Sequence, residues 1–126
     1  TLLKQAALQA QCTGTIGTYE GALGSSTAAT FTAQPGDCIY YRITANNTFT
    51  SISNTAINNI VLSDLTKQWK PKSAYQPTTA SSSTGGPTTV TIANPNVSAT
   101  EAVTTTLPTL SAGASGNLTF AIKVGP

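Results

Sequence analysis

The sequence predicts an all-β domain, a sandwich or barrel of about seven or eight short strands, and three observations favour this fold class. Its polarity comes from hydroxyls and amides, because the 126 residues include 24 Thr, 12 Ser and 8 Asn but six basic and four acidic side chains. Thr is β-branched and suits a half-buried, pleated surface. Apolar and polar residues alternate with period two in several segments, and clusters of Gly, Pro, Asn and Ser separate these segments.

The first segment of the chain is ambiguous on local pattern. As a helix it would form one apolar stripe from Leu3, Ala6, Ala7 and Ala10, with Thr1 as its only candidate N-cap. As a strand it would gather Leu2, Lys4, Ala6, Leu8 and Ala10 on one face. The residues alone leave both forms open.

Two segments carry the clearest strand patterns. Residues 37–47 follow the turn signal Pro35-Gly36 and put four side chains on one face, namely Ile39, Tyr41, Ile43 and Ala45. Residues 117–124 do the same with Leu118, Phe120, Ile122 and Val124. Both patterns indicate strands that are buried on one side.

Weaker patterns predict five further strands. They are Thr27–Ala33, Ala56–Asp64, Gln68–Gln76, Thr88–Ala93 and Thr100–Leu107. Pro71 restricts the third of these to a sheet edge or a loop, because proline cannot donate a ladder hydrogen bond. Residues 78–87 read TTASSSTGGP, a low-complexity composition that predicts an exposed loop.

The composition argues against several classes of function. The chain has no His and only four carboxylates, which leaves few metal ligands and no usual general base. We therefore expect no enzyme activity, no metal and no cofactor. A net charge of +2 is too small to indicate a nucleic-acid partner. The long uncharged runs are rich in Thr, Ser and Gly, so we expect no insertion into a membrane.

Cys12 and Cys38 suggest the compartment. Two cysteines in a small, Thr-rich chain favour one disulfide formed in an oxidising space. The alternative is a pair of buried free thiols in a cytosolic protein. The sequence starts at Thr1 rather than Met, which suggests a processed or excised chain.

Four segments also point to one family. They are Cys12-Thr-Gly-Thr, Gln34–Thr48 with its Pro-Gly-Asp turn before an alternating strand, Asn58–Asp64, and Thr109–Gly113 followed by Asn117–Val124. Together they resemble the conserved-repeat domain, of unknown function, that occurs in bacterial and archaeal cell-surface proteins. The resemblance covers about residues 12–64 and 107–124 and leaves 65–106 unmatched. It implies an immunoglobulin-like β-sandwich, an extracellular location at the cell surface and no catalytic residues.

In such a domain the N-terminal segment is expected to be a strand. We predict two parts, residues 1–11 as a possible donor strand and residues 12–126 as the sandwich. An edge strand can pair with another chain, so copies could assemble head to tail into a filament or fimbria. The donor would use Leu2, Leu3, Ala6, Leu8 and Ala10. The alternative is an ordinary first strand of the same sandwich, in a spacer or adhesive module of a large adhesin.

Trp69 and Tyr75 are candidates for ligand stacking. Three lysines surround Trp69, and aromatic rings beside basic groups can stack on sugars or bases. A glycan is therefore a possible partner. The simpler interpretation is an edge strand whose lysines prevent unwanted pairing with another chain. Calcium binding by Asp37 and Asp64 is a weaker prediction than a turn role for Asp37, because the four acids are scattered.

Overall fold

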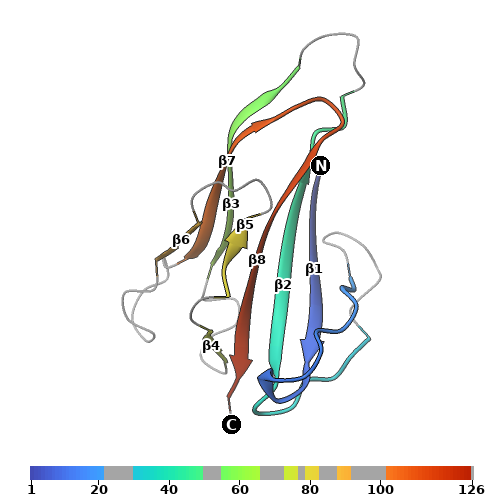
Figure 1. Ribbon diagram of the computed structural model, residues 1–126, viewed down its shortest axis with the longest axis vertical. Coiled ribbons are helices and arrows are strands. Elements are labelled where there is room, and N and C mark those ends of the chain that lie inside the picture. The colour runs from blue at the N-terminus through green and yellow to red at the C-terminus, as the bar shows by residue number, and fades with distance from the viewer. Residues whose placement is uncertain are drawn as a thin grey trace.

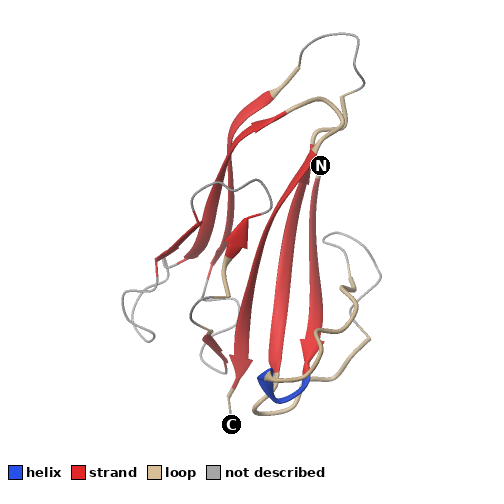
Figure 2. Cartoon of the chain, viewed as in Figure 1, coloured by secondary structure: helices blue, strands red, loops and turns tan. Residues whose placement is uncertain are grey.

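The computed structural model describes residues 1–21, 30–49, 55–65, 73–76, 79–82, 88–91 and 102–125. Over these residues the chain is all-β, with two antiparallel sheets packed against each other (Figure 1). The predicted β-sandwich is confirmed. Figure 2 shows that the helical content of the described residues is one 3₁₀ turn, η1 (Ala10–Cys12).

The larger sheet has the order β1-β2-β8-β4, with β5 also paired to β8. Its members are β1 (Leu2–Gln9), β2 (Cys38–Asn46), β8 (Ser115–Val124), β4 (Ser73–Tyr75) and β5 (Ser81–Ser82). The first two strands of the sequence lie side by side, and the last strand lies next to β2 (Figure 1). The N-terminal strand therefore forms one edge of this sheet.

The smaller sheet has the order β3-β7-β6. Its members are β3 (Ile57–Leu65), β7 (Ala102–Leu110) and β6 (Thr88–Thr91). Strand β3 is an edge strand on this sheet, as β1 is on the other. Asn59 has a left-handed φ of 54°, and the register of β3 with β7 skips this residue, between the pair of Asn58 with Thr109 and the pair of Ile60 with Leu107.

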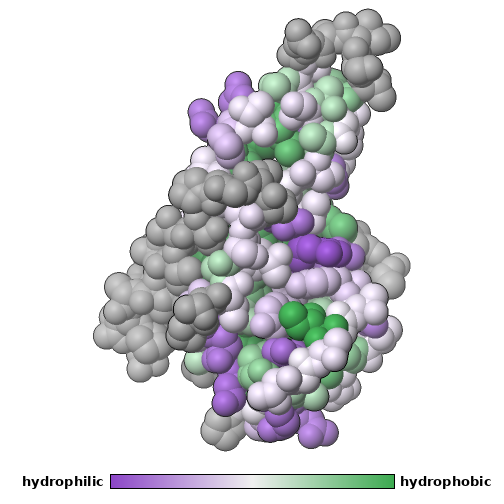
Figure 3. Space-filling model, viewed as in Figure 1, coloured by the Kyte–Doolittle hydropathy of each residue, from purple (hydrophilic) through white to green (hydrophobic). Residues whose placement is uncertain are grey.

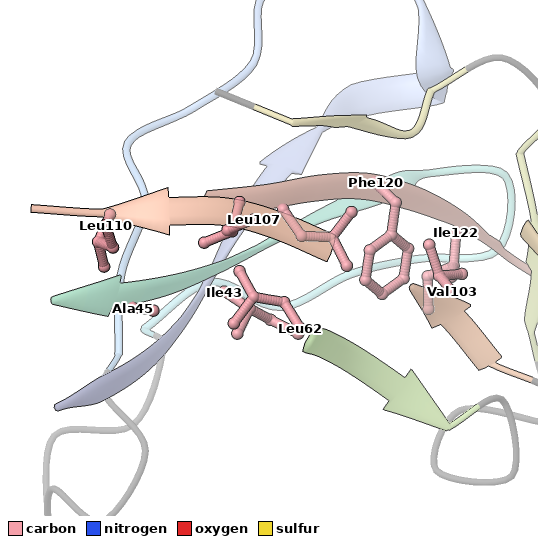
Figure 4. Close-up of a cluster of buried hydrophobic side chains, with 9 residues drawn as sticks. Ile43, Ala45, Leu62, Val103, Leu107, Leu110, Phe120 and Ile122 are labelled. Carbon is pink, nitrogen blue, oxygen red and sulfur yellow. The ribbon is translucent and has the colours of Figure 1, made fainter. Parts of the chain in front are cut away.

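The core lies between the two sheets (Figure 4). Phe120 is its largest fully buried side chain, and its ring lies 5.6 Å from that of Tyr41. The period-two predictions for β2 and β8 are confirmed, because the predicted inner faces supply much of this cluster. The buried members are Ile43, Ala45, Leu62, Val103, Leu107, Leu110, Leu118, Phe120 and Ile122.

Asn47 is the buried polar residue that closes the end of the core. Its Nδ2 donates to the carbonyls of Thr55 and Leu110 at 2.8 and 2.9 Å. Its backbone N–H donates to the carbonyl of Ala114 at 2.9 Å. These bonds join the end of β2 to chain segments of both sheets, and the bond to Leu110 satisfies a buried carbonyl.

Two local predictions are wrong. Residues 30–33 of the predicted strand Thr27–Ala33 form a loop, and its first residues lie outside the described part of the chain. Residues 81–82 of the predicted loop form β5, because Thr79 ties this segment to β8 through a hydroxyl that accepts the Ala121 N–H at 2.9 Å. Both errors concern Thr- and Ser-rich stretches, whose pattern carries little information on pairing.

Candidate functional site: the N-terminal edge strand

The candidate site is β1 together with the surfaces that hold it. Strand β1 pairs antiparallel with β2 over its whole length, from Leu2 opposite Ala45 to Gln9 opposite Cys38. The N-terminal ammonium donates to the carbonyl of Asn46 at 2.8 Å, which extends the ladder to the first residue. The segment is a strand, and in the single chain it lies in its own sheet.

The two faces of β1 have different surroundings. The predicted apolar side chains Leu2, Ala6 and Leu8 lie opposite β2 residues of the core face, while Leu3 lies on the other face, opposite Thr44. Ala10 lies beyond the strand, in η1, and is exposed. Ala7, which faces outward with Leu3, is the one fully buried residue of the strand. The outer face of β1 is therefore closed to solvent at Ala7.

The chain segment that follows η1 passes beside β1 (Figure 1). Backbone N–H and C=O groups of Ala6 and Glu20 bond each other at 2.9 and 2.7 Å, and Gly17 donates to the carbonyl of Leu8 at 2.8 Å. These groups of Ala6 and Leu8 point away from β2. Strand β1 is thus bonded along both backbone edges in its second half, whereas Leu2 and Lys4 have no backbone partner on this outer edge within the described residues.

A cation–π contact supports the same segment. The Arg42 guanidinium on β2 lies 4.1 Å from the centre of the Tyr19 ring and donates to Gln5 of β1 at 2.8 Å. Burial raises the pKa of the Tyr19 hydroxyl, and the positive charge of Arg42 partly opposes this rise. Tyr19 therefore remains neutral at physiological pH and packs as an aromatic cover.

The turn after β1 is fixed by a disulfide. Cys12 is bonded to Cys38, with Cα atoms 4.8 Å apart, which confirms the predicted pairing. Gln11 and Cys12 both have left-handed φ angles, 51° and 57°, which are unusual for residues other than glycine. The chain thus reverses direction over residues 10–12, and the disulfide anchors the turn to the first residue of β2.

Asp37 holds this turn from the other side. Its carboxylate accepts the backbone N–H groups of Gln11 and Gln34, each at 2.9 Å. The bond from Gln11, and then that from Gln34, keeps the pKa of Asp37 below its ordinary value. The turn role predicted for Asp37 therefore includes a partner 26 residues away, which the local sequence could not indicate.

A charged pair joins β1 to the opposite sheet. Lys4 Nζ lies 2.7 Å from Asp64 Oδ2 on β3, and the Asp64 side chain is only 4% exposed. The same ammonium lies 4.7 Å from the centre of the Tyr41 ring. Burial, and then the negative charge of Asp64, raises the pKa of the Tyr41 hydroxyl. The alternation in the sequence put Lys4 on the inner face of a strand, but no pattern indicated its partner.

An apolar cavity of ≈ 270 Å³ lies beside the start of β1. It is bounded by Leu2 and by β3 residues that include the exposed Ile57 and Val61. Figure 3 shows hydrophobic side chains at this end of the molecule. The two edge strands, β1 and β3, therefore leave an apolar opening between the sheets.

Of the predicted stacking pair the described residues include Tyr75 alone, so the aromatic site stays a prediction. Tyr75 lies on β4, half-buried and packed against the core, while Trp69 lies outside the described part of the chain. No group of three metal-ligating side chains occurs among the described residues. Asp37 instead accepts backbone N–H groups, and Asp64 forms an ion pair with the Lys4 ammonium.

No protein-family model, no curated protein and no solved structure matches this chain. The resemblance to the conserved-repeat domain therefore stays a prediction. Within the described ranges, no helix is long and apolar enough to cross a membrane. The disulfide fits folding in an oxidising compartment.

Proposed function

We propose that this protein is a structural, non-catalytic subunit of an extracellular filament, in which β1 of one copy occupies the β1 position of the next. The proposal is supported by the contacts that hold β1 in its own sheet. One backbone edge bonds β2, the other bonds Gly17 and Glu20, and Lys4 pairs with Asp64 across the core. We call β2, the 17–20 backbone and Asp64 the acceptor site. A strand from a second copy would make the same bonds there.

The strained turn at residues 10–12 favours exchange of β1 between copies over permanent pairing of β1 within its own copy. Gln11 and Cys12 each hold a left-handed conformation, at a cost of about 1–2 kcal/mol per residue. Extending the chain at this point would release that strain. The disulfide would keep everything from Cys12 onward in the parent subunit, so the exchanged part would be residues 1–11, as the predicted division has it.

Exchange between copies leads naturally to a filament. Each copy offers one strand and one acceptor site, so a head-to-tail contact that does not close adds subunits without limit. The low charge of the chain also suits close packing, because each buried charge would need a partner. In this proposal the location is the cell exterior, in accord with the disulfide. The spacer module is the alternative, with β1 kept in its own sheet.

A disulfide-trapping experiment tests the exchange. Leu2 and Ala45 are a directly opposed pair that does not share ladder hydrogen bonds, so their Cα atoms are expected to lie about 4.5 Å apart. One batch of full-length protein carries Leu2→Cys and an isotope label, and an unlabelled batch carries Ala45→Cys. Mixing under mild oxidation should give a labelled–unlabelled dimer. Leu3→Cys is the matched control, because its side chain faces outward and cannot reach the thiol introduced by Ala45→Cys.

Electron microscopy of the unmodified protein supplies the second readout. We expect filaments from the full chain and none after deletion of residues 1–9, which spares Cys12. Monodisperse globules from the full chain, with no crosslink between the Leu2→Cys and Ala45→Cys proteins, would refute the filament and favour the spacer module.

A further inference from the structure

We infer that the Lys4–Asp64 pair selects which strand the acceptor site takes, and in what register. This inference rests on the exchange proposed above and names its partner: a second copy of this chain, recognised by a cation at the fourth position of its first strand. The observation behind it is the 2.7 Å ion pair, in which one charge belongs to the donor strand and the other to the acceptor site.

Within the described residues, the acceptor site supplies no cation of its own to Asp64. Arg42, on β2, contacts Gln5 and Tyr19 on the outer face of the sheet. Lys123, on β8, is exposed and lies opposite Cys38, on that same outer face. In this part of the chain, Lys4 is therefore the basic side chain that reaches the buried Asp64 carboxylate, and it arrives only with the donor strand.

The pair also fixes the register. Lys4 lies opposite Ile43, and a shift of two residues would put Leu2 or Ala6 there instead. A shift of one residue would turn Lys4 to the outer face and bring Leu3 or Gln5 inward. Each shift leaves a buried carboxylate without a cation, which is strongly unfavourable. Alanine and leucine alone would specify the register weakly against a two-residue shift, since the strand would then still present apolar side chains to the core.

The Tyr41 ring increases the preference of the acceptor site for a cation at the fourth position of the donor strand. The Lys4 ammonium lies 4.7 Å from the centre of the Tyr41 ring, and the same ring packs against Phe120 in the core. A cation at this position gains both the carboxylate and the ring face. A neutral side chain of similar length gains neither. The acceptor site therefore discriminates by charge at the position of Lys4. The backbone hydrogen bonds of the strand do not depend on its sequence, and Gln5 adds one side-chain bond, to Arg42.

The test uses the same trapping assay in full-length protein, with Leu2→Cys in the donor and Ala45→Cys in the acceptor. The donor carries either native Lys4 or Lys4→Met, and the acceptor carries either native Asp64 or Asp64→Asn. With the native Asp64 acceptor, we expect the Lys4→Met donor to crosslink at least about tenfold more slowly than the native donor. With the Asp64→Asn acceptor this ratio should shrink toward one. Circular dichroism checks that each variant is folded.

A charge-exchanged pair gives the second readout. Protein with Lys4→Glu and protein with Asp64→Lys should each fail to assemble alone, because like charges meet at the pair. The mixture should crosslink, since the donor strand of each variant then meets a side chain of opposite charge at position 64 of the other variant. If either exchanged variant does not fold, the comparison of Lys4→Met with Asp64→Asn still decides the matter.

The outcomes separate the two proposals. Equal crosslinking of native and Lys4→Met donors to the native Asp64 acceptor would overturn the selection by charge, while leaving strand exchange intact. Absence of any crosslink between donors with native Lys4 and acceptors with native Asp64 would overturn the exchange itself, and this inference with it.

Discussion

Lys4 Nζ and Asp64 Oδ2 lie 2.7 Å apart and join the edge strand of one sheet to the edge strand of the other. The carboxylate is buried, while the lysine side chain retains 24% of its exposure. A charged pair at this depth costs desolvation of both groups, so it contributes little net stability compared with an apolar pair of the same shape. Removal of one partner is far more costly, because it leaves the other charge buried without a counter-charge.

This asymmetry gives a first prediction, for the folded single chain. Lys4→Met should lower the free energy of unfolding by on the order of 2 kcal/mol, because Asp64 stays buried without its cation. The double variant Lys4→Met/Asp64→Leu should recover most of that loss. Urea unfolding of both variants and of Asp64→Leu alone completes a double-mutant cycle. Additive losses would show that the two residues do not interact in solution.

A second prediction concerns the core. Phe120 is fully buried and packs beside Tyr41, so Phe120→Ala should lower the free energy of unfolding by about 3–5 kcal/mol through lost burial and a cavity. Phe49→Ala is the matched control, because Phe49 is 58% exposed. Its effect should stay below about 0.5 kcal/mol. Thermal and urea unfolding would both reveal the difference, and equal losses would mean that the core is assigned wrongly.

The disulfide gives a third prediction. Cys12 and Cys38 close a loop with a sequence separation of 26. By the loop-entropy model, the double variant Cys12→Ala/Cys38→Ala should lose about 3.5 kcal/mol of stability. The variant should also free the turn at residues 10–12, so hydrogen exchange at Gln11 should accelerate more than exchange in the core of β8. Unchanged stability without the bond would indicate that the denatured chain is already compact.

Asp37 gives a fourth prediction, on pH. Its folded pKa is depressed by the N–H groups of Gln11 and then Gln34, so its contribution is present above the unfolded pKa of about 3.9. It is lost as pH falls through the folded value. The melting temperature of the native protein should therefore drop below about pH 4. Asp37→Asn should be less stable at pH 7 and should lose less on acidification.

Glu20 is the control for this acid transition. The hydroxyl and then the backbone N–H of Thr30 depress its pKa, so it acts over the same acid range. Glu20→Gln should leave the larger part of the acid dependence in place, because Glu20 is bound at the surface while Asp37 is buried in the turn. A melting profile for Asp37→Asn that matches the native protein at every pH would contradict the role of this carboxylate.

The sequence by itself determined the local form of the strands. Alternation in β2 and β8 identified the inner faces of both, since a strand that is buried on one side must repeat with period two. The cysteine count was enough to predict the bond between Cys12 and Cys38. Proline and glycine marked the turn before β2. These features depend on residue types and on residues close together in the chain, so a pattern can reveal them.

Only the tertiary structure decided which distant residues meet. Asp64 on β3 faces Lys4, Asp37 caps the turn at Gln11, and Glu20 bonds the outer backbone edge of β1 at Ala6. None of these contacts follows from period or propensity, because each depends on the order of strands within the sheets and on how the sheets stack. The ambiguity of the first segment was resolved in the same way. An open edge on β2 accepts residues 2–9 as a strand, and its hydrogen bonds outweigh a helical preference that is weak on its own.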